Sequence, residues 1–339
     1  MKRAMTIVLD GTPVVDAPFT GIARYTQELA AALRELHPDA RLLLESCPQE
    51  ASLIEGRWWS IGLPRRLRET GASLFHGTDF AVPLLGKTPA VVTVHDLSPL
   101  RAREFAMPPQ AKRVARRLPG AIRRASAVIV PSERVAEEVR RRFSAARQKI
   151  AVTPLAAASA FSPRPATKTS GQYILYVGSG QRRKNLDMLV RVFSRIRSGL
   201  RQSIELVVVG GGSQMALQSG VKQMRGVTDE DLAKLYSGTS AFVYPSSYEG
   251  FGLPVVEAMA CGAPVVAVRD TAAGDVAGDA ALLTDGSERA LEEGLAGILE
   301  DSAWSGELRK KSLARAKSFS WRRTAELTWG VYQVALGNT

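Results

Sequence analysis

Short apolar runs and amphipathic helical patterns alternate along the 339 residues, and this alternation constrains the fold more than any other feature. Runs such as 90–94 and 127–130 consist mostly of β-branched and aliphatic residues, as in strands that are buried on both faces. The alternation pauses at 157–171, which is rich in Pro, Ser, Thr and Ala. Strands that alternate with helices form parallel sheets covered on both faces, so we predict two doubly wound α/β units joined by a linker.

The loops that follow the strands are the candidate binding sites, because ligands of doubly wound sheets bind beyond the carboxyl ends of the strands. We expect strands at 6–10, 90–94, 127–130, 150–153, 173–177, 204–209, 241–244 and 264–268. We expect helices at 22–36, 133–143, 185–196, 228–236 and 253–260. The candidate loops are 11–21, 95–96, 178–184, 210–212 and 246–252.

The charge of the chain is concentrated in its first half. The net charge is +12; residues 1–160 carry 24 Lys/Arg against 15 Asp/Glu, and the remainder carries 21 against 18. Solvated helix faces would explain this excess, and so would contact with an anionic membrane surface or an anionic acceptor. A nucleic-acid partner is disfavoured, because neither aromatic interleaving nor a known binding module accompanies the basic runs.

Features that would indicate export or metal binding are missing from the sequence. No apolar stretch approaches the roughly 20 residues that span a bilayer. Residues 1–10 contain two basic residues and a short apolar run closed by Asp10, which predicts a first strand rather than a signal peptide. Cys47 and Cys261 are far apart, so neither a disulfide framework nor a zinc site is expected. A cytoplasmic location fits, with an alternative in which the basic half lies at the inner membrane face.

The segment 244–266 carries the most chemical information. Gly250 and Gly252 lie in the loop before a helix with Pro254 in its first turn. The backbone N–H groups of Phe251, Gly252 and Leu253 would point at an anion there, assisted by the helix dipole.

Two carboxylates, Glu249 and Glu257, bracket this helix start. Carboxylates repel phosphate but accept hydrogen bonds from sugar hydroxyls, so the local chemistry fits a diphosphate between two polyols, as in a nucleotide sugar. The alternative is an ordinary helix start, with Glu257 facing solvent and Glu249 in a plain turn.

Glu249-x7-Glu257, with Gly-Phe-Gly-Leu-Pro between the two residues, closely resembles the signature of retaining glycosyltransferases of family 4. Further segments resemble the same family in the expected order and extend the resemblance over nearly the whole chain: 20–25, 92–99, 176–185, 227–232, 278–283 and 321–332.

The resemblance implies the GT-B fold, in which two Rossmann-like doubly wound domains face an interdomain cleft. We expect an acceptor-binding domain at 1–160, a linker at 161–171 and a donor-binding domain at 172–318. The C-terminal segment 319–339 is expected to form a helix that packs back toward the first domain.

The resemblance also assigns roles to individual residues. Glu249 would bind hydroxyls of the transferred sugar, Glu257 those of the ribose, and His95 would lie against the sugar near the reacting carbon. Arg183 and Lys184, where negative charge develops on the leaving diphosphate, would stabilise the transition state. The remaining donor-binding positions are Gly21, Gly178, Gly226, Val227, Gly250, Phe251, Gly252 and Leu253.

The implied reaction is retaining transfer of a hexose of the mannose, rhamnose or glucose type from a nucleotide-diphosphate sugar to a polysaccharide or lipid-linked saccharide. The leaving phosphate would take the acceptor proton in a same-face attack. No metal cofactor is expected, because Asp229-Glu230-Asp231 fits a helix cap better than a metal motif. The alternatives are an epimerase or phosphorylase on the same fold, and a non-catalytic nucleotide-sugar-binding scaffold.

The sequence departs from the family pattern at several positions. Ser179 stands where many members carry Arg, and Asp275 stands where many carry Glu, in what we expect to be a loop. The first domain is short between His37 and His76, so acceptor contacts cannot be carried over from relatives. We expect His76 to be a structural residue, and a satisfied structural histidine is also an alternative for His95.

Overall fold

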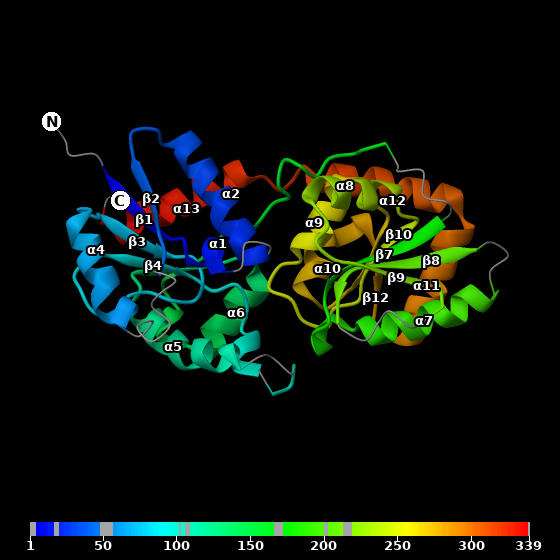
Figure 1. Ribbon diagram of the computed structural model, residues 1–339, viewed down its shortest axis with the longest axis horizontal. Helices are drawn as coiled ribbons and strands as arrows, with labels where there is room; N and C mark the ends of the chain where they lie inside the picture. The colour runs from blue at the N-terminus through cyan, green and yellow to red at the C-terminus, as the bar shows by residue number, and fades with distance from the viewer. Residues whose placement is uncertain are drawn as a thin grey trace. The chain divides into compact units, whose positions relative to one another are not determined.

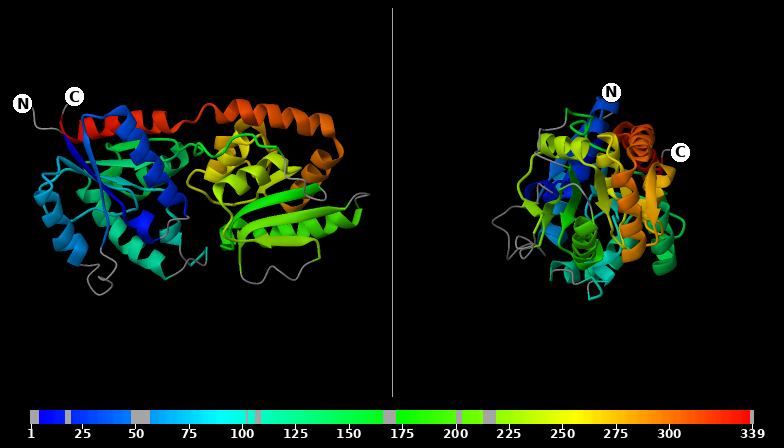
Figure 2. Two further views of the ribbon diagram at one scale, coloured as in Figure 1. Left: turned by 45° about the horizontal axis from the view of Figure 1, so that its top comes forward. Right: turned by 90° about the vertical axis from the view of Figure 1, so that its right-hand side faces the viewer.

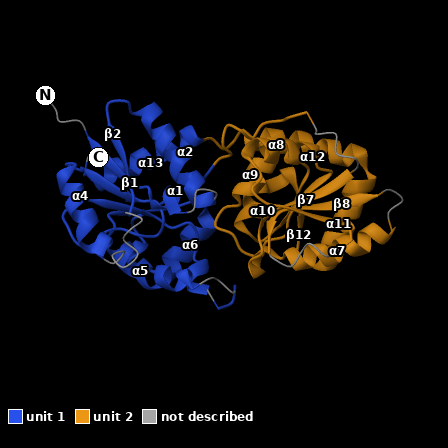
Figure 3. Ribbon diagram, viewed as in Figure 1, with its two compact units in different colours: residues 1–155, 321–339 blue, residues 156–320 orange. Residues whose placement is uncertain are grey.

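The computed structural model describes residues 5–16, 20–47, 57–101, 103–105, 109–165, 172–199, 203–212 and 219–337. The chain divides into two compact units (Figure 3): unit 1 contains residues 1–155 and 321–339, and unit 2 contains residues 156–320. Of the expected linker, residues 166–171 lie outside the described part. Phe161, at its start, contacts Tyr236 of unit 2 edge-on, with ring centroids 6.0 Å apart.

Unit 1 is built on a six-stranded parallel sheet with the order β2-β1-β3-β4-β5-β6 (Figure 1). Its strands are short and most are buried on both faces, which explains their nearly continuous apolar sequences. The strands are β1 (Thr6–Asp10), β2 (Arg41–Glu45), β3 (Leu74–Gly77), β4 (Ala90–Thr93), β5 (Ala127–Val130) and β6 (Ile150–Val152).

Helices cover both faces of this sheet. On one face α2 (Gly21–Leu36) packs against α13 (Trp321–Ala335), so the C-terminal helix completes unit 1 (Figure 2). On the other face α5 (Gln110–Arg124) and α6 (Glu133–Arg142) bury Leu118, Ile122 and Val139 in the main hydrophobic core. The smaller elements are α1 (Thr12–Asp16), η2 (Trp58–Gly62), α4 (Leu63–Glu69), η3 (Ser98–Arg101) and η4 (Ser144–Ala146).

Unit 2 repeats the plan with a second parallel sheet, in the order β12-β11-β10-β7-β8-β9. The strands are β7 (Gln172–Ser179), β8 (Ile204–Gly211), β9 (Val221–Met224), β10 (Ala241–Tyr244), β11 (Val265–Val268) and β12 (Ala281–Thr284). The helices and turns are η5 (Arg182–Lys184), α7 (Leu186–Gly199), α8 (Asp229–Gly238), α9 (Leu253–Ala260), α10 (Ala272–Ala277), η7 (Gly278–Ala280), α11 (Glu288–Glu300) and α12 (Ser302–Ala316).

The order of strands reverses once in each sheet. In unit 2 it runs outward from β7 to β8 and β9, and from β10 to β11 and β12 on the other side. The carboxyl ends of β7 and β10 are therefore neighbours at a topological switch point, where doubly wound sheets bind their ligands. In unit 1 the corresponding neighbours are β1 and β3.

All the expected strands are present, and the parallel α/β fold is confirmed. Two expectations are wrong in detail. Asn185 does not belong to a helix, because its φ of 51° is left-handed and α7 begins one residue later. Asp275 lies in α10 rather than in a loop, because the Oγ1 of Thr271 accepts a hydrogen bond from Gly274 N (3.1 Å) and starts a helix there. Among the described residues, no helix combines the length and apolar character needed to cross a bilayer.

Candidate functional site

The loops after β7 and β10 are joined at the switch point of unit 2. The backbone N–H of Ser247 donates to the carbonyl of Arg183 (2.9 Å). The Asn185 side chain donates to the carbonyl of Pro245 (3.0 Å), which accounts for the left-handed conformation of this residue. These bonds fix the basic turn η5 beside the loop that leads into α9.

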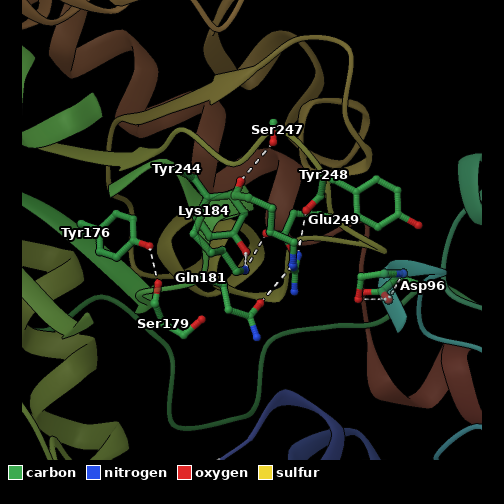
Figure 4. A network of polar contacts seen from close by, with 11 residues as sticks. Asp96, Tyr176, Ser179, Gln181, Lys184, Tyr244, Ser247, Tyr248 and Glu249 are labelled. Carbon is green, nitrogen blue, oxygen red and sulfur yellow. Dashed lines mark hydrogen bonds and ion pairs between the residues drawn. The ribbon is translucent and has the colours of Figure 1, made fainter. Parts of the chain in front are cut away.

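A buried ion-pair cluster lies between the two loops (Figure 4). Glu249 Oε2 is 3.0 Å from Arg183 Nη1, and Glu249 Oε1 is 2.5 Å from Lys184 Nζ. The three side chains are only 8–11% exposed. Burial opposes the charged form of Glu249, but the two cations outweigh it and hold the pKa of this carboxyl below its usual value.

Aromatic and backbone groups hold the two cations in place. Lys184 Nζ donates to the hydroxyl of Tyr244 (2.7 Å) and lies 4.9 Å from the centroid of the same ring. Burial raises the pKa of Tyr244 well above its usual value, so this hydroxyl is neutral. Arg183 Nη1 donates to the carbonyl of Tyr248 (2.7 Å), and Arg183 Nε donates to Gln181 (3.1 Å). Tyr244 and Gln181 were not predicted as site residues, because neither type indicates anion binding by itself.

The start of α9 presents backbone N–H groups beside this cluster. Gly252 caps the helix with a φ of 105°, and a Cβ at this position would lie 2.8 Å from the Cβ of Ala273. The N–H groups of Phe251, Gly252 and Leu253 donate no hydrogen bond to any part of the chain that the structure describes. A helix start with unused donors and two adjacent cations is suited to a polyanion.

Glu257 lies on the same helix but not on its solvent-facing side. Glu257 is only 4% exposed, and the hydroxyl of Tyr236 from α8 donates a hydrogen bond to Glu257 Oε2 (3.4 Å). The alternative in which Glu257 faces solvent is therefore wrong. A buried carboxylate beside a helix start is a candidate to accept hydrogen bonds from ligand hydroxyls.

Glycines allow the ends of β7 and β8 to approach closely. Gly178 is paired with Gly210, and a Cβ on Gly210 would lie 2.4 Å from the Gly178 carbonyl oxygen. The other predicted backbone positions, Gly226 and Val227, directly precede α8, and Gly226 has a φ of 63°. Gly250 lies in the loop before α9.

The acidic triplet 229–231 forms the first turn of α8. The Oγ1 of Thr228 accepts a hydrogen bond from Asp231 N (3.2 Å) and donates to the carboxylate of Asp231 (2.9 Å). The interpretation of this triplet as a helix cap is confirmed.

In unit 1, His95 follows β4 and has a defined tautomer. Its Nε2 is 2.7 Å from the carbonyl oxygen of Thr78. A carbonyl only accepts, and burial lowers the pKa of His95, so the ring is neutral with the proton on Nε2. The Nδ1 lone pair forms no hydrogen bond within the described part of the chain. His95 can therefore accept a hydrogen bond from a ligand hydroxyl.

His76 has a structural role, as expected. Its Nδ1 contacts the hydroxyl of Tyr332 on α13, and its Nε2 contacts Thr93 Oγ1, both at 2.7 Å. Burial lowers the pKa of His76 to about 3, so the ring is neutral. It links the C-terminal helix to the sheet. Gly21 is the exposed first residue of α2, whose cap is Thr20.

Two buried carboxyl groups at the carboxyl ends of the neighbouring strands β1 and β3 were not predicted as site residues. Asp10 ends β1, and Asp79 follows β3 by two residues. Burial raises the pKa of Asp79 to about 7 and that of Asp10 to about 6, with further contributions from neighbouring carboxylates. Their position at or shortly after the carboxyl end of a strand was the available signal.

Models of two known families match the chain. The model for glycosyl transferases group 1 matches residues 159–319, and the model for glycosyltransferase family 4 matches residues 19–156. The chain belongs to the group 1/family 4 glycosyltransferases. The predicted family and enzyme class are thus confirmed, and the matched ranges include every predicted site residue.

Individual relatives and solved structures agree with this assignment. The glycosyltransferase is 28% identical to O-antigen chain mannosyltransferase B of Escherichia coli, over 96% of this chain and 99% of the relative. It superposes on sucrose-phosphate synthase from Thermosynechococcus elongatus with a TM-score of 0.78 at 21% identity, over 99% and 100% of the two chains. For Anabaena HepE in complex with UDP and glucose, the TM-score is 0.71 at 17% identity, over 98% and 100%. These superpositions confirm the GT-B fold.

Proposed function

We propose that the protein is a retaining glycosyltransferase that moves a hexose from a nucleotide-diphosphate sugar on unit 2 to a saccharide or lipid-linked saccharide on unit 1. The observation that carries the proposal is the cluster of Glu249, Arg183 and Lys184 at the switch point of the unit 2 sheet. Burying charged groups costs desolvation energy, and this cluster lies where such sheets bind ligands, which supports a role for it in ligand binding.

The donor would be held by groups of opposite character. The N–H groups at the start of α9, with Arg183 and Lys184, would bind the diphosphate, and Glu257 would accept the ribose hydroxyls. Backbone at Gly226 and Val227 would contact the base. Because Glu249 pairs with both cations, a diphosphate would compete with Glu249 for them. Once displaced, the carboxylate can accept the hydroxyls of the transferred sugar.

The transfer step would depend on positioning and electrostatics. Breaking the bond from the sugar to the β-phosphate leaves negative charge on the phosphate oxygen, which Arg183 and Lys184 stabilise. In a same-face attack that oxygen takes the proton of the acceptor hydroxyl as the new glycosidic bond forms. Neutral His95, with its Nδ1 acceptor, would orient a sugar hydroxyl near the reacting carbon.

Similarity to the relatives supports particular substrates for this protein. Similarity over nearly the full length to an O-antigen chain mannosyltransferase supports mannose as the sugar and a polysaccharide or its lipid-linked precursor as the acceptor. The fold shared with a UDP-bound structure supports a nucleotide-sugar donor. Rhamnose and glucose remain the alternative sugars.

A thermal-unfolding screen against GDP-, UDP-, dTDP- and ADP-sugars tests the donor assignment. A donor at 100 times its Kd is expected to raise the free energy of unfolding by about 2.7 kcal/mol, because it binds only the folded protein. We expect GDP-mannose to give the largest shift. Absence of a shift with every nucleotide sugar, with and without added saccharide, would contradict the proposal and favour a non-catalytic scaffold.

We also propose that the basic face of unit 1 contacts an anionic membrane. Helix α5 carries six Lys/Arg and no acidic residue. The exposed side chains of Leu84 (57%) and Leu85 (62%) lie next to it, and Arg124 fixes their loop through hydrogen bonds to the carbonyls of Gly86 and Thr88, both 2.9 Å. Apolar side chains flanked by cations suit an anionic lipid surface.

Vesicle flotation tests this contact. The protein is expected to float with vesicles containing phosphatidylglycerol and not with phosphatidylcholine alone, because each nearby Lys or Arg contributes about 1 kcal/mol at an anionic surface. Added salt should release it. Leu84→Ser/Leu85→Ser should weaken the association. Equal flotation with both kinds of vesicle would remove the proposal.

A further inference from the structure

A cavity in unit 1 lies beside the loop that carries His95 and belongs to none of the sites described above. It has a volume of about 420 Å³ and is lined by Leu97, Leu100, Arg101, Glu138, Arg141 and Arg142. The leucines and Arg101 come from the segment of η3, and the other three residues from the last turns of α6. The volume is within the range of small-molecule sites.

The η3 side of the cavity is held in place by local bonds. Asp96 Oδ1, next to His95, accepts hydrogen bonds from Ser98 N (2.9 Å) and Ser98 Oγ (2.7 Å), which fixes the turn. Arg101 Nε donates to Glu104 (2.8 Å), and the guanidinium group lies 4.5 Å from the centroid of the Phe105 ring. Leu97 is 2% exposed and packs into the unit 1 core, so it forms a rigid apolar wall.

The α6 side of the cavity supplies two arginines that have no ion-pair partner among the described residues. Arg140 is 3.6 Å from Glu133 on the same helix and does not line the cavity. Arg141 and Arg142 make no hydrogen bond or ion pair with any described residue. With three arginines and one glutamate, the lining has a net charge of +2, which becomes +1 when Glu104, the partner of Arg101, is included.

Basic residues in the last turn of a helix have an ordinary explanation, since they stabilise the helix by interacting with its dipole. That effect requires neither a cavity nor apolar walls beside the charges. Guanidinium groups bind phosphate through paired hydrogen bonds, and the half-buried Leu100, backed by Leu97, would contact hydrocarbon. The ligand class that satisfies both halves of the lining is a phosphate group joined to a hydrocarbon chain.

We propose that this cavity binds the phosphate and the adjoining hydrocarbon of a lipid-linked saccharide acceptor. The inference deepens the proposed function and rests on it for the identity of the ligand as an acceptor. The saccharide end of such an acceptor would extend toward His95, which precedes the cavity wall by two residues. Because phospholipid head groups share the phosphate–hydrocarbon chemistry, the experiment must separate these two sources.

The first arm measures binding of decyl phosphate, below its micellar concentration, by titration calorimetry. We expect decyl phosphate to bind at least about tenfold more tightly than inorganic phosphate or decyl maltoside, because only it offers both groups. Arg141→Gln/Arg142→Gln should lose at least this factor. Arg140→Gln, which removes one positive charge from the same helix turn outside the cavity, should bind within about twofold of wild type. Equal binding by the double variant, or an equal loss in Arg140→Gln, would overturn the proposal.

The second arm separates the acceptor from the membrane. With an alkyl-diphosphate-linked mannoside as acceptor, Arg141→Gln/Arg142→Gln should raise the acceptor KM at least about tenfold, with flotation on phosphatidylglycerol vesicles unchanged. Lost flotation with an unchanged acceptor KM would assign the cavity to phospholipid and overturn the acceptor assignment. Nucleotide-sugar thermal shifts should be the same in wild type and variant. Suppose that no nucleotide sugar raises the melting temperature of wild type or variant, while decyl phosphate still binds. The proposed function then fails, and the phosphate–hydrocarbon site stands.

Discussion

Lys184→Met is expected to lower the turnover number about 10²–10³-fold, the range found when one preorganised donor to a developing anion is removed. Lys184 Nζ is held by the Tyr244 hydroxyl at 2.7 Å and by Glu249 at 2.5 Å, so its position is fixed before the donor arrives. A cation fixed at the leaving phosphate stabilises charge that is present mainly in the transition state. The loss should therefore appear in kcat more than in the donor KM, in steady-state kinetics.

The fold should survive this change. Glu249 keeps its ion pair with Arg183, while Glu249 Oε1 and the Tyr244 hydroxyl each lose a partner, so the free energy of unfolding should fall by about 1–3 kcal/mol. Lys234→Met is the matched control, because Lys234 is also in unit 2 and pairs with two carboxylates, Glu230 (3.1 Å) and Asp231 (3.2 Å), at the surface. The transfer rate of Lys234→Met should stay within about twofold of wild type, because most surface ion pairs contribute little free energy. A near-normal rate in Lys184→Met would remove the role assigned to this residue.

Glu249→Ala is expected to reduce transfer at least about 100-fold, equivalent to about 2.7 kcal/mol of transition-state stabilisation, because the transferred sugar loses its acceptor of hydroxyl hydrogen bonds. The same change leaves Arg183 and Lys184 buried without their shared counter-ion. Loss of one partner from a buried ion pair typically costs about 3–5 kcal/mol of stability. Kinetics and chemical denaturation measure the two effects separately.

The competition between Glu249 and the diphosphate gives this variant a distinctive response to anions. Inorganic diphosphate should raise the melting temperature of Glu249→Ala more than that of wild type, because the anion no longer has to displace a carboxylate 2.5–3.0 Å from the cations. A smaller shift than in wild type would show that Glu249 organises the two cations for the diphosphate and does not compete with it. A transfer rate of Glu249→Ala equal to that of wild type would exclude a role of Glu249 in binding the transferred sugar.

The pH dependence of stability provides an independent check on the same ion pairs. The pKa of Glu249 in the folded protein lies below its ordinary value of 4.5. A carboxyl with a lowered folded pKa contributes stability that is complete above its unfolded pKa and is lost as the pH falls through the folded pKa. The stability difference between wild type and Glu249→Gln should therefore be constant above pH 5 and shrink below about pH 4.5.

The strands that sequence analysis missed share a physical cause. The edge strands β2, β9 and β12 are flanked on one side only, and their residues are largely half-buried or exposed. These strands are short, and charged or polar residues flank or interrupt their apolar positions, so their patterns do not differ clearly from loops. The fourth missed strand, β3, is central and fully buried, but its four residues include His76 and Gly77, which weaken a strand pattern.

The sequence by itself determined the kind and order of most structural elements and the parallel sheets, and it predicted the loop before α9 as an anion site. These features depend on local periodicity and on the chemistry of neighbouring residues, which a sequence displays directly. Only the tertiary structure decided that Glu249 pairs with Arg183 and Lys184, that Glu257 is buried, and that His95 carries its proton on Nε2. Each depends on which groups from distant segments meet where the strand order reverses, and periodicity reports which face of an element is buried but not what lies against it.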